Sequence, residues 1–172
     1  QKEDFRVFQG DGFKVAEFPY GQGNFVMDVI LPDEADGLTE VMARLSDSSF
    51  SSWINTMTVN ELQVNFPRFK YGFRLTLKDI LTDMGMGIAF TDAANFSNIS
   101  EQYDLLINEV THQSFIETNE EGTEAAAATV VEVGTTSMPV NMEFNMDHPF
   151  IYIIRETTTN SIIFMGRVAD PT

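Results

Sequence analysis

The chain has 172 residues, of which 43% are hydrophobic and 12% aromatic, so it has enough apolar material for a packed core. Its 10 basic and 26 acidic residues give a formal net charge of −16, which disfavours nucleic acid and anionic membrane surfaces as partners. Because there is no cysteine, disulfides, thiolate metal sites and a cysteine nucleophile are excluded. No apolar run approaches the length of a membrane-spanning segment.

The first third of the chain is predicted to form strands. Residues 5–8 and 13–18 alternate between apolar and polar, and residues 25–31 form a nearly continuous apolar run typical of a buried strand. Residues 19–24 contain the proline and glycines of a turn. The chain begins at Gln1 directly on a strand pattern, without a secretory signal, so we expect it to be part of a longer protein.

Two short helices are predicted next. Their apolar residues recur at helical spacing, namely Leu38, Val41, Met42 and Leu45 in the first helix and Phe50, Trp53, Ile54 and Met57 in the second. Residues 46–49 are serine and aspartate, which favour the N-terminal cap of a helix. The spacing therefore predicts a helical pair after the opening strands.

The remainder of the chain returns mainly to strands, predicted at residues 62–66, 69–75, 105–117, 150–155 and 161–168. A short helix over residues 78–84 is expected to stop at Gly85, and residues 91–102 form a polar loop. The predicted fold class is α+β, mostly strands with a few short helices.

Motifs of enzymes are missing from the chain. Neither His112 nor His148 has a metal-binding partner three or four residues away, and we expect His112 to be a hydrogen-bonded core residue on a strand. The chain has no G-x-S-x-G elbow and no H-E-x-x-H motif. We therefore expect no catalytic activity, no bound metal and no cofactor.

Residues 120–133 are unusually rich in small side chains. Read with a period of two, one face is uncharged and small to medium in size, consisting of Thr123, Ala125, Ala127, Thr129, Val131 and Val133. The two glutamates of residues 123–133, Glu124 and Glu132, fall on the other face. Alanine also favours helices, so the segment suits a chain that changes conformation.

Several motifs around this segment resemble the serpin family of serine protease inhibitors, in the family's order and spacing across nearly the whole chain. They are Pro67-Arg68-Phe69, Leu77-Lys78-Asp79-Ile80-Leu81, Asn95-Phe96-Ser97-Asn98-Ile99-Ser100, Asp147-His148-Pro149-Phe150 and Phe164-Met165-Gly166-Arg167-Val168. The resemblance implies that residues 1–172 are the C-terminal part of a single serpin domain, with mostly antiparallel sheets. Its hinge and reactive-centre loop would lie at about 119–142, and the N-terminal half of the fold would lie outside this chain.

The resemblance also implies a mechanism and its residues. A target serine protease would cut the loop, and the hinge would then insert as a strand into a sheet beside residues 105–117. The implied hinge residues are Glu121, Gly122, Thr123, Glu124, Ala125, Ala126, Ala127, Ala128 and Thr129. His112 would belong to the core of the sheet that accepts the loop.

The cut in inhibitory serpins usually follows the fourteenth residue after the hinge glycine. Counting from Gly122 places it at the bond between Thr136 and Ser137. No basic residue lies near this bond, so an elastase-like or subtilisin-like target is expected over a trypsin-like one. A register two residues later would present Met138 to a broader elastase- or chymotrypsin-like protease.

Other interpretations remain open. A non-inhibitory serpin that acts as a carrier or chaperone is one alternative, and a chain that is inactive without its N-terminal half is another. Exposed sheet edges in such a chain would favour edge-to-edge self-association. The resemblance implies an extracellular or cell-envelope location.

Overall fold

The computed structural model describes residues 2–118 and 142–171. The chain divides into two compact units, one made of Gln1–Phe69 with Thr118–Thr172 and the other of Lys70–Glu117. Each unit is described by itself below.

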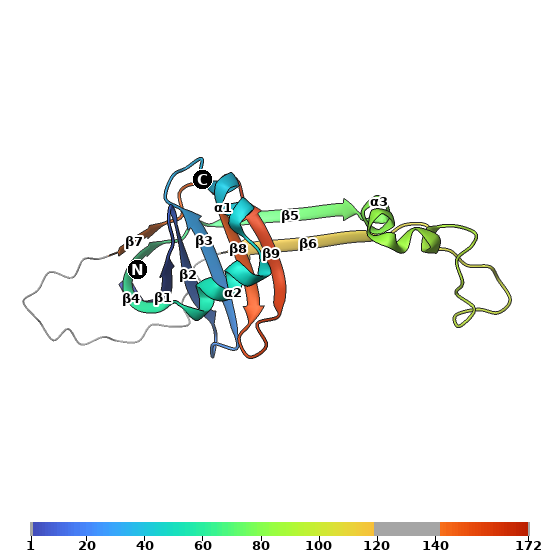
Figure 1. The fold of residues 1–172 in the computed structure, drawn as a ribbon, viewed down its shortest axis with the longest axis horizontal. Coiled ribbons are helices and arrows are strands. Elements are labelled where there is room, and N and C mark those ends of the chain that lie inside the picture. The colour runs from blue at the N-terminus through green and yellow to red at the C-terminus, as the bar shows by residue number, and fades with distance from the viewer. Residues whose placement is uncertain (1, 119–141, 172) are drawn as a thin grey trace, which may run out of the picture. The chain divides into compact units, whose positions relative to one another are not determined.

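The first unit is built on a seven-stranded sheet with the strand order β7-β4-β1-β2-β3-β8-β9 (Figure 1). Its strands are β1 (Lys2–Gln9), β2 (Phe13–Tyr20), β3 (Phe25–Pro32), β4 (Thr58–Asn65), β7 (Met142–Asn145), β8 (Phe150–Glu156) and β9 (Ile162–Val168). Neighbouring strands are antiparallel except β4 and β7, which run parallel. The strands predicted in the first third and at the end of the chain are confirmed, and the mostly antiparallel α+β class is confirmed with them.

Helices α1 (Leu38–Arg44) and α2 (Asp47–Asn55) cover one face of this sheet (Figure 1). The Ser46 hydroxyl accepts a hydrogen bond from the Ser49 amide, and the Ser49 hydroxyl accepts one from the Ser46 amide, so the predicted cap of α2 is confirmed. The helices bury a core with the sheet that consists of Phe13, Val15, Ile30, Leu38, Val41, Phe50, Trp53, Ile54, Ile151 and Ile153.

Aromatic side chains cover the opposite face. Phe144 is fully buried and lies 5.9 Å from Phe18, and Phe18 lies 5.6 Å from Phe66 in an edge-to-face arrangement. Phe69 continues this cluster at 5.9 Å from Phe150. The cluster therefore joins β2, β7 and β8 to the segment between β4 and β5.

The second unit contains most of a two-stranded sheet and a helical segment. Its elements are β5 (Phe69–Thr76), α3 (Lys78–Leu81), a π-helical turn (Thr82–Met86), a 3₁₀ turn (Gly87–Phe90) and β6 (Thr111–Thr118). Gly85 has a φ of 98°, which glycine adopts readily, and this break in the helical backbone agrees with the predicted stop.

The predicted long strand over residues 105–117 is wrong in its first half, because β6 begins only at Thr111. The backbone before it bonds elsewhere: the Leu77 amide donates to the Val110 carbonyl at 2.8 Å, and the Ile107 amide donates to the Ala89 carbonyl at 2.9 Å. These bonds tie residues 107 and 110 to the helical segment instead of to a strand ladder.

The predicted place of His112 in the core of the loop-accepting sheet stays a prediction. His112 lies on β6, and its side chain is exposed. In the described part of the chain, β6 pairs only with β5. A two-stranded sheet without a covering layer leaves its side chains open to water.

Candidate functional site

The predicted reactive bond and hinge lie outside the described residues. This applies to Thr136 and Ser137, and to the hinge residues Glu121, Gly122, Thr123, Glu124, Ala125, Ala126, Ala127, Ala128 and Thr129. The structure instead describes the two strands that flank this segment in the sequence, β6 before it and β7 after it. These strands are the attachment points of the predicted loop.

β7 holds the C-terminal end of the predicted loop. It has only four residues, and its parallel register sets Phe144 beside Val64. The full burial of Phe144 supplies most of the apolar contact of this strand. At the end of the strand, the Asn65 amide group donates a hydrogen bond to the side-chain oxygen of Asn145. Packing and hydrogen bonds therefore fix β7 at the edge of the sheet despite its short length.

Thr118 ends β6 on the N-terminal side of the predicted loop. Its hydroxyl accepts a hydrogen bond from the Phe69 amide at 3.1 Å and donates to the Pro67 carbonyl at 3.2 Å. One side chain therefore holds the end of β6 against the start of β5. The sequence contains no pattern that singles out this threonine.

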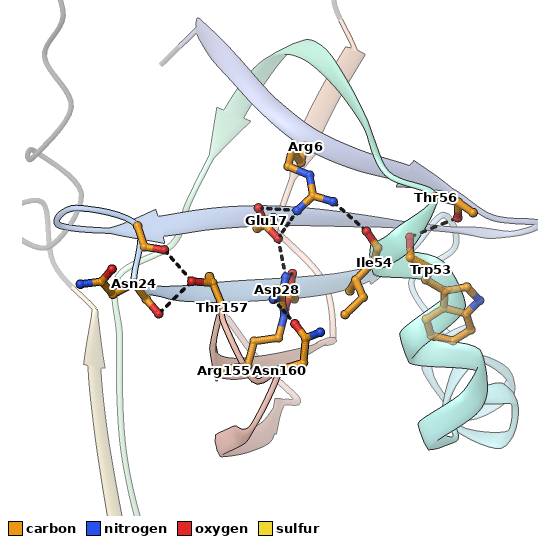
Figure 2. Close-up of polar contacts among 11 residues, drawn as sticks. Arg6, Glu17, Asn24, Asp28, Trp53, Ile54, Thr56, Arg155, Thr157 and Asn160 are labelled. Carbon is orange, nitrogen blue, oxygen red and sulfur yellow. Dashed lines mark hydrogen bonds and ion pairs between the residues drawn. The ribbon is translucent and has the colours of Figure 1, made fainter.

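A partly buried group of charges crosses the helix-covered face of the sheet (Figure 2). Arg155 on β8 is 3% exposed and donates from Nε to Asp28 Oδ2 at 2.7 Å. It also donates to Glu17, and to Asn160 Oδ1 at 2.8 Å. Arg6 on β1 completes the group with a hydrogen bond to Glu17 at 3.0 Å. The group therefore links β1, β2, β3 and β8.

Burial governs the ionisation of Asp28. Asp28 is 0% exposed, and removal from water raises its pKa to about 6, although the hydrogen bond and charge of Arg155 lower it. The carboxylate is therefore ionised at neutral pH and protonates in mild acid. Arg6 extends the group to the end of α2, where it donates to the Ile54 carbonyl at 2.8 Å.

None of the predicted functional residues belongs to this charged group. A signal was present, because Asp28 interrupts the apolar run of residues 25–31 and Arg155 follows the apolar residues of β8. A charged residue inside a buried strand requires a partner of opposite charge. Such a pair can be predicted by looking for one isolated acidic residue and one isolated basic residue on two strands that are expected to be buried.

Within residues 2–118 and 142–171, none of the helices combines the length and apolar character needed to cross a membrane. In the same residues, no group of three or more His, Cys, Asp or Glu side chains is placed to hold a metal ion.

A family model described as "Serpin (serine protease inhibitor)" matches residues 1–171. A protein named "Serine protease inhibitor" from Cyanea capillata is 40% identical over 173 residues, which cover 98% of this chain and 45% of that protein. The chain thus spans about half the length of the curated relatives it matches.

Two solved structures show the same fold. One is a cleaved ovalbumin mutant whose structure is described as loop-inserted. It matches with a TM-score of 0.84 and 29% identity, and the match covers 99% of this chain and 45% of the ovalbumin chain. The other is human thyroxine-binding globulin in complex with its hormone. It matches with a TM-score of 0.84 and 26% identity, and the match covers 100% of this chain and 45% of the globulin chain. The family match extends over nearly every residue and agrees with the sheet and helices described above. The chain therefore belongs to the serpin family.

Proposed function

We propose that the protein to which this chain belongs inhibits a serine protease as a suicide substrate, outside the cell or in the cell envelope. The protease serine attacks the Thr136 carbonyl carbon, the amine of Ser137 leaves with a proton, and an ester joins Thr136 to the enzyme. Hydrolysis of this ester would release the protease. Inhibition requires that insertion of the loop distorts the protease before water completes that step.

The observation that carries the proposal is the small, uncharged face of the hinge, which follows directly after β6. In the described part of the chain, β6 pairs only with β5, so its second edge can receive a strand. About ten residues entering a sheet would gain on the order of 10 kcal/mol from hydrogen bonds worth roughly 1 kcal/mol each. The relative described as loop-inserted supports the same use of the fold.

The target class follows from the predicted cut. Because Thr136 is small and β-branched and has no basic neighbour, it suits an elastase-like or subtilisin-like pocket. The test mixes the full-length protein with elastase-like, subtilisin-like and trypsin-like proteases and looks for a complex that survives a denaturing gel. The expected result is a complex with the first or second protease and a released peptide that begins at Ser137. Complete cleavage without a complex for every protease would overturn the proposal.

A carrier function is the second candidate, because thyroxine-binding globulin bound to its hormone shares this fold. A carrier would be cleaved in the loop without trapping the protease. The same gel therefore separates the two functions, since only the inhibitor yields a covalent complex.

A further inference from the structure

The loop of residues 91–102 contains two copies of the pattern Asn-x-Ser. They are Asn95-Phe96-Ser97 and Asn98-Ile99-Ser100, and every other asparagine of the chain lacks a serine or threonine two positions later. The middle residue is phenylalanine in one copy and isoleucine in the other, and not proline. This pattern is the acceptor sequence for N-linked glycosylation, and an acceptor must lie on a surface loop to carry a glycan.

The fold places both asparagines on such a surface. The loop follows the helical turns of the second unit, beyond α3, and leads back toward β6 (Figure 1). The side chains of Asn95 and Asn98 are both exposed. A group attached to either amide would therefore extend into water.

The loop is held by hydrogen bonds within itself. The Ser97 amide donates to Asn95 Oδ1 at 3.0 Å, and the Ile99 amide donates to the Phe96 carbonyl at 2.8 Å. In the described part of the chain, the hydrogen bonds of residues 91–102 have both partners within residues 88–102. A bulky group on Asn95 or Asn98 thus breaks no described hydrogen bond to β5 or β6.

Large side chains next to the two acceptors are open to water. Ile99 is 76% exposed and Tyr103 is 66% exposed. An N-linked glycan is bulky and hydrated. Attached to a neighbouring asparagine, it would keep these side chains from contact with a second chain.

The two acceptors are too close for both to be used at once. Three residue steps of the chain span at most about 11 Å. The turn closed between Phe96 and Ile99 shortens this separation. A glycan on one asparagine therefore blocks the enzyme that would modify the other.

We propose that residues 95–100 are a shared acceptor site that carries one N-linked glycan, on either Asn95 or Asn98. The sugar donor is an oligosaccharide linked through its first sugar to a lipid diphosphate. The asparagine amide nitrogen bonds to C1 of that sugar, and the bond between C1 and the diphosphate oxygen breaks. The lipid diphosphate leaves with the electron pair, and the amide nitrogen gives up a proton. Natural use of the site rests on the location outside the cell that is part of the proposed function.

The test expresses the full-length protein in eukaryotic cells with an added secretion signal, which supplies the route to the transferring enzyme. A glycosidase that removes N-linked glycans converts the modified asparagine to aspartate, and peptide mass spectrometry then shows which position changed. Each molecule should show one conversion, at Asn95 or at Asn98. No conversion, or both in the same molecule, would overturn the proposal. A sample without the glycosidase corrects for spontaneous deamidation.

Matched variants remove each acceptor without changing an asparagine. Ser97→Ala should direct the glycan to Asn98, and Ser100→Ala should direct it to Asn95. The double variant should lose the glycan from this loop. A glycan in the double variant, or its loss in either single variant, contradicts a shared site.

The outcome is independent of protease inhibition. The experiment uses no protease, and the double variant should trap a target protease as well as the unmodified protein does. A protein that stays inside the cell with its own N-terminal region would contradict the proposed location and leave the acceptor result standing. Failure of the glycan site and failure of the proposed function are therefore separate outcomes.

Discussion

Arg155 and Asp28 form a charged pair, and they are the two charged residues that are buried in the described part of the chain. The Arg155 guanidinium donates hydrogen bonds to the carboxylates of Asp28 and Glu17. It donates another to the side-chain amide oxygen of Asn160. No described buried side-chain nitrogen or oxygen is left without a hydrogen-bond partner. A buried ion pair of this kind contributes little net stability compared with apolar residues, but removing one partner is costly.

Replacing Arg155 with methionine should therefore destabilise the protein by about 3–5 kcal/mol, because it leaves Asp28 buried without a counter-charge. The free energy of unfolding in urea measures this effect. Arg167→Met is the matched control, since Arg167 is exposed on β9, and its effect should stay within about 0.5 kcal/mol. Similar losses in the two variants would show that the buried pair has no special role.

Asp28 also predicts a pH dependence of stability. Its folded pKa of about 6 lies above the ordinary value of 3.8, so the folded state binds the proton more tightly. The stability from this group is fully present below pH 3.8 and is lost as pH rises through about 6. The free energy of unfolding of the unmodified protein, measured relative to Asp28→Asn, should fall over this interval. A constant difference would mean that burial does not raise the pKa of Asp28.

At the scale of elements, β6 and β7 differ in how they are held. β7 is anchored by the buried ring of Phe144 and by pairing with β4. β6 pairs with β5 and is tied at its end by Thr118, while Phe115 on the same strand is 58% exposed. In the described part of the chain, the strand anchored by Phe144 follows the predicted loop, and the strand paired with β5 precedes it.

The hinge provides a prediction at this scale because its two faces differ. Ala127 lies on the face proposed to be buried on insertion, and Ala126 lies on the opposite face. Ala127→Arg should turn the full-length inhibitor into a substrate, since a buried charge without a partner opposes insertion. Ala126→Arg should leave the complex largely intact. The fraction of protease trapped on a denaturing gel measures both, and equal trapping by the two variants contradicts insertion by this face.

At the scale of the whole molecule, the chain exposes apolar residues on its edge strand β9. Ile162, Phe164 and Met165 are 48%, 51% and 59% exposed. The relatives it matches are about twice as long, so we infer that the remaining part of the domain covers this strand. Exposed apolar edges otherwise favour pairing with a second chain.

The 172-residue chain alone should therefore form no protease complex and should associate with itself. Light scattering after size-exclusion chromatography measures its mass, and co-expression with the N-terminal part of the protein should restore a one-to-one assembly. A monomeric chain that traps protease by itself would refute both expectations.

Most of the local structure could be predicted from the order of the residues. Helical spacing and the Ser46 cap located α1 and α2, alternation located most strands, and ordered motifs identified the serpin family. These signals are local, because caps and periodicity act within a few residues. They also define the small face of the hinge, which stays a prediction because it lies outside the described residues.

Only the tertiary structure decided which distant residues meet. It set β7 parallel to β4, and Asn145 thereby bonds to Asn65 across 80 positions of the chain. It set the start of β6 at Thr111, buried Asp28 with Arg155, and brought both nitrogens of His148 to accepting oxygens. Such contacts depend on the pairing of strands that are far apart in sequence. Of the two strands that flank the predicted loop, β6 was predicted in part and β7 was not, and the contacts that hold both strands came from the fold.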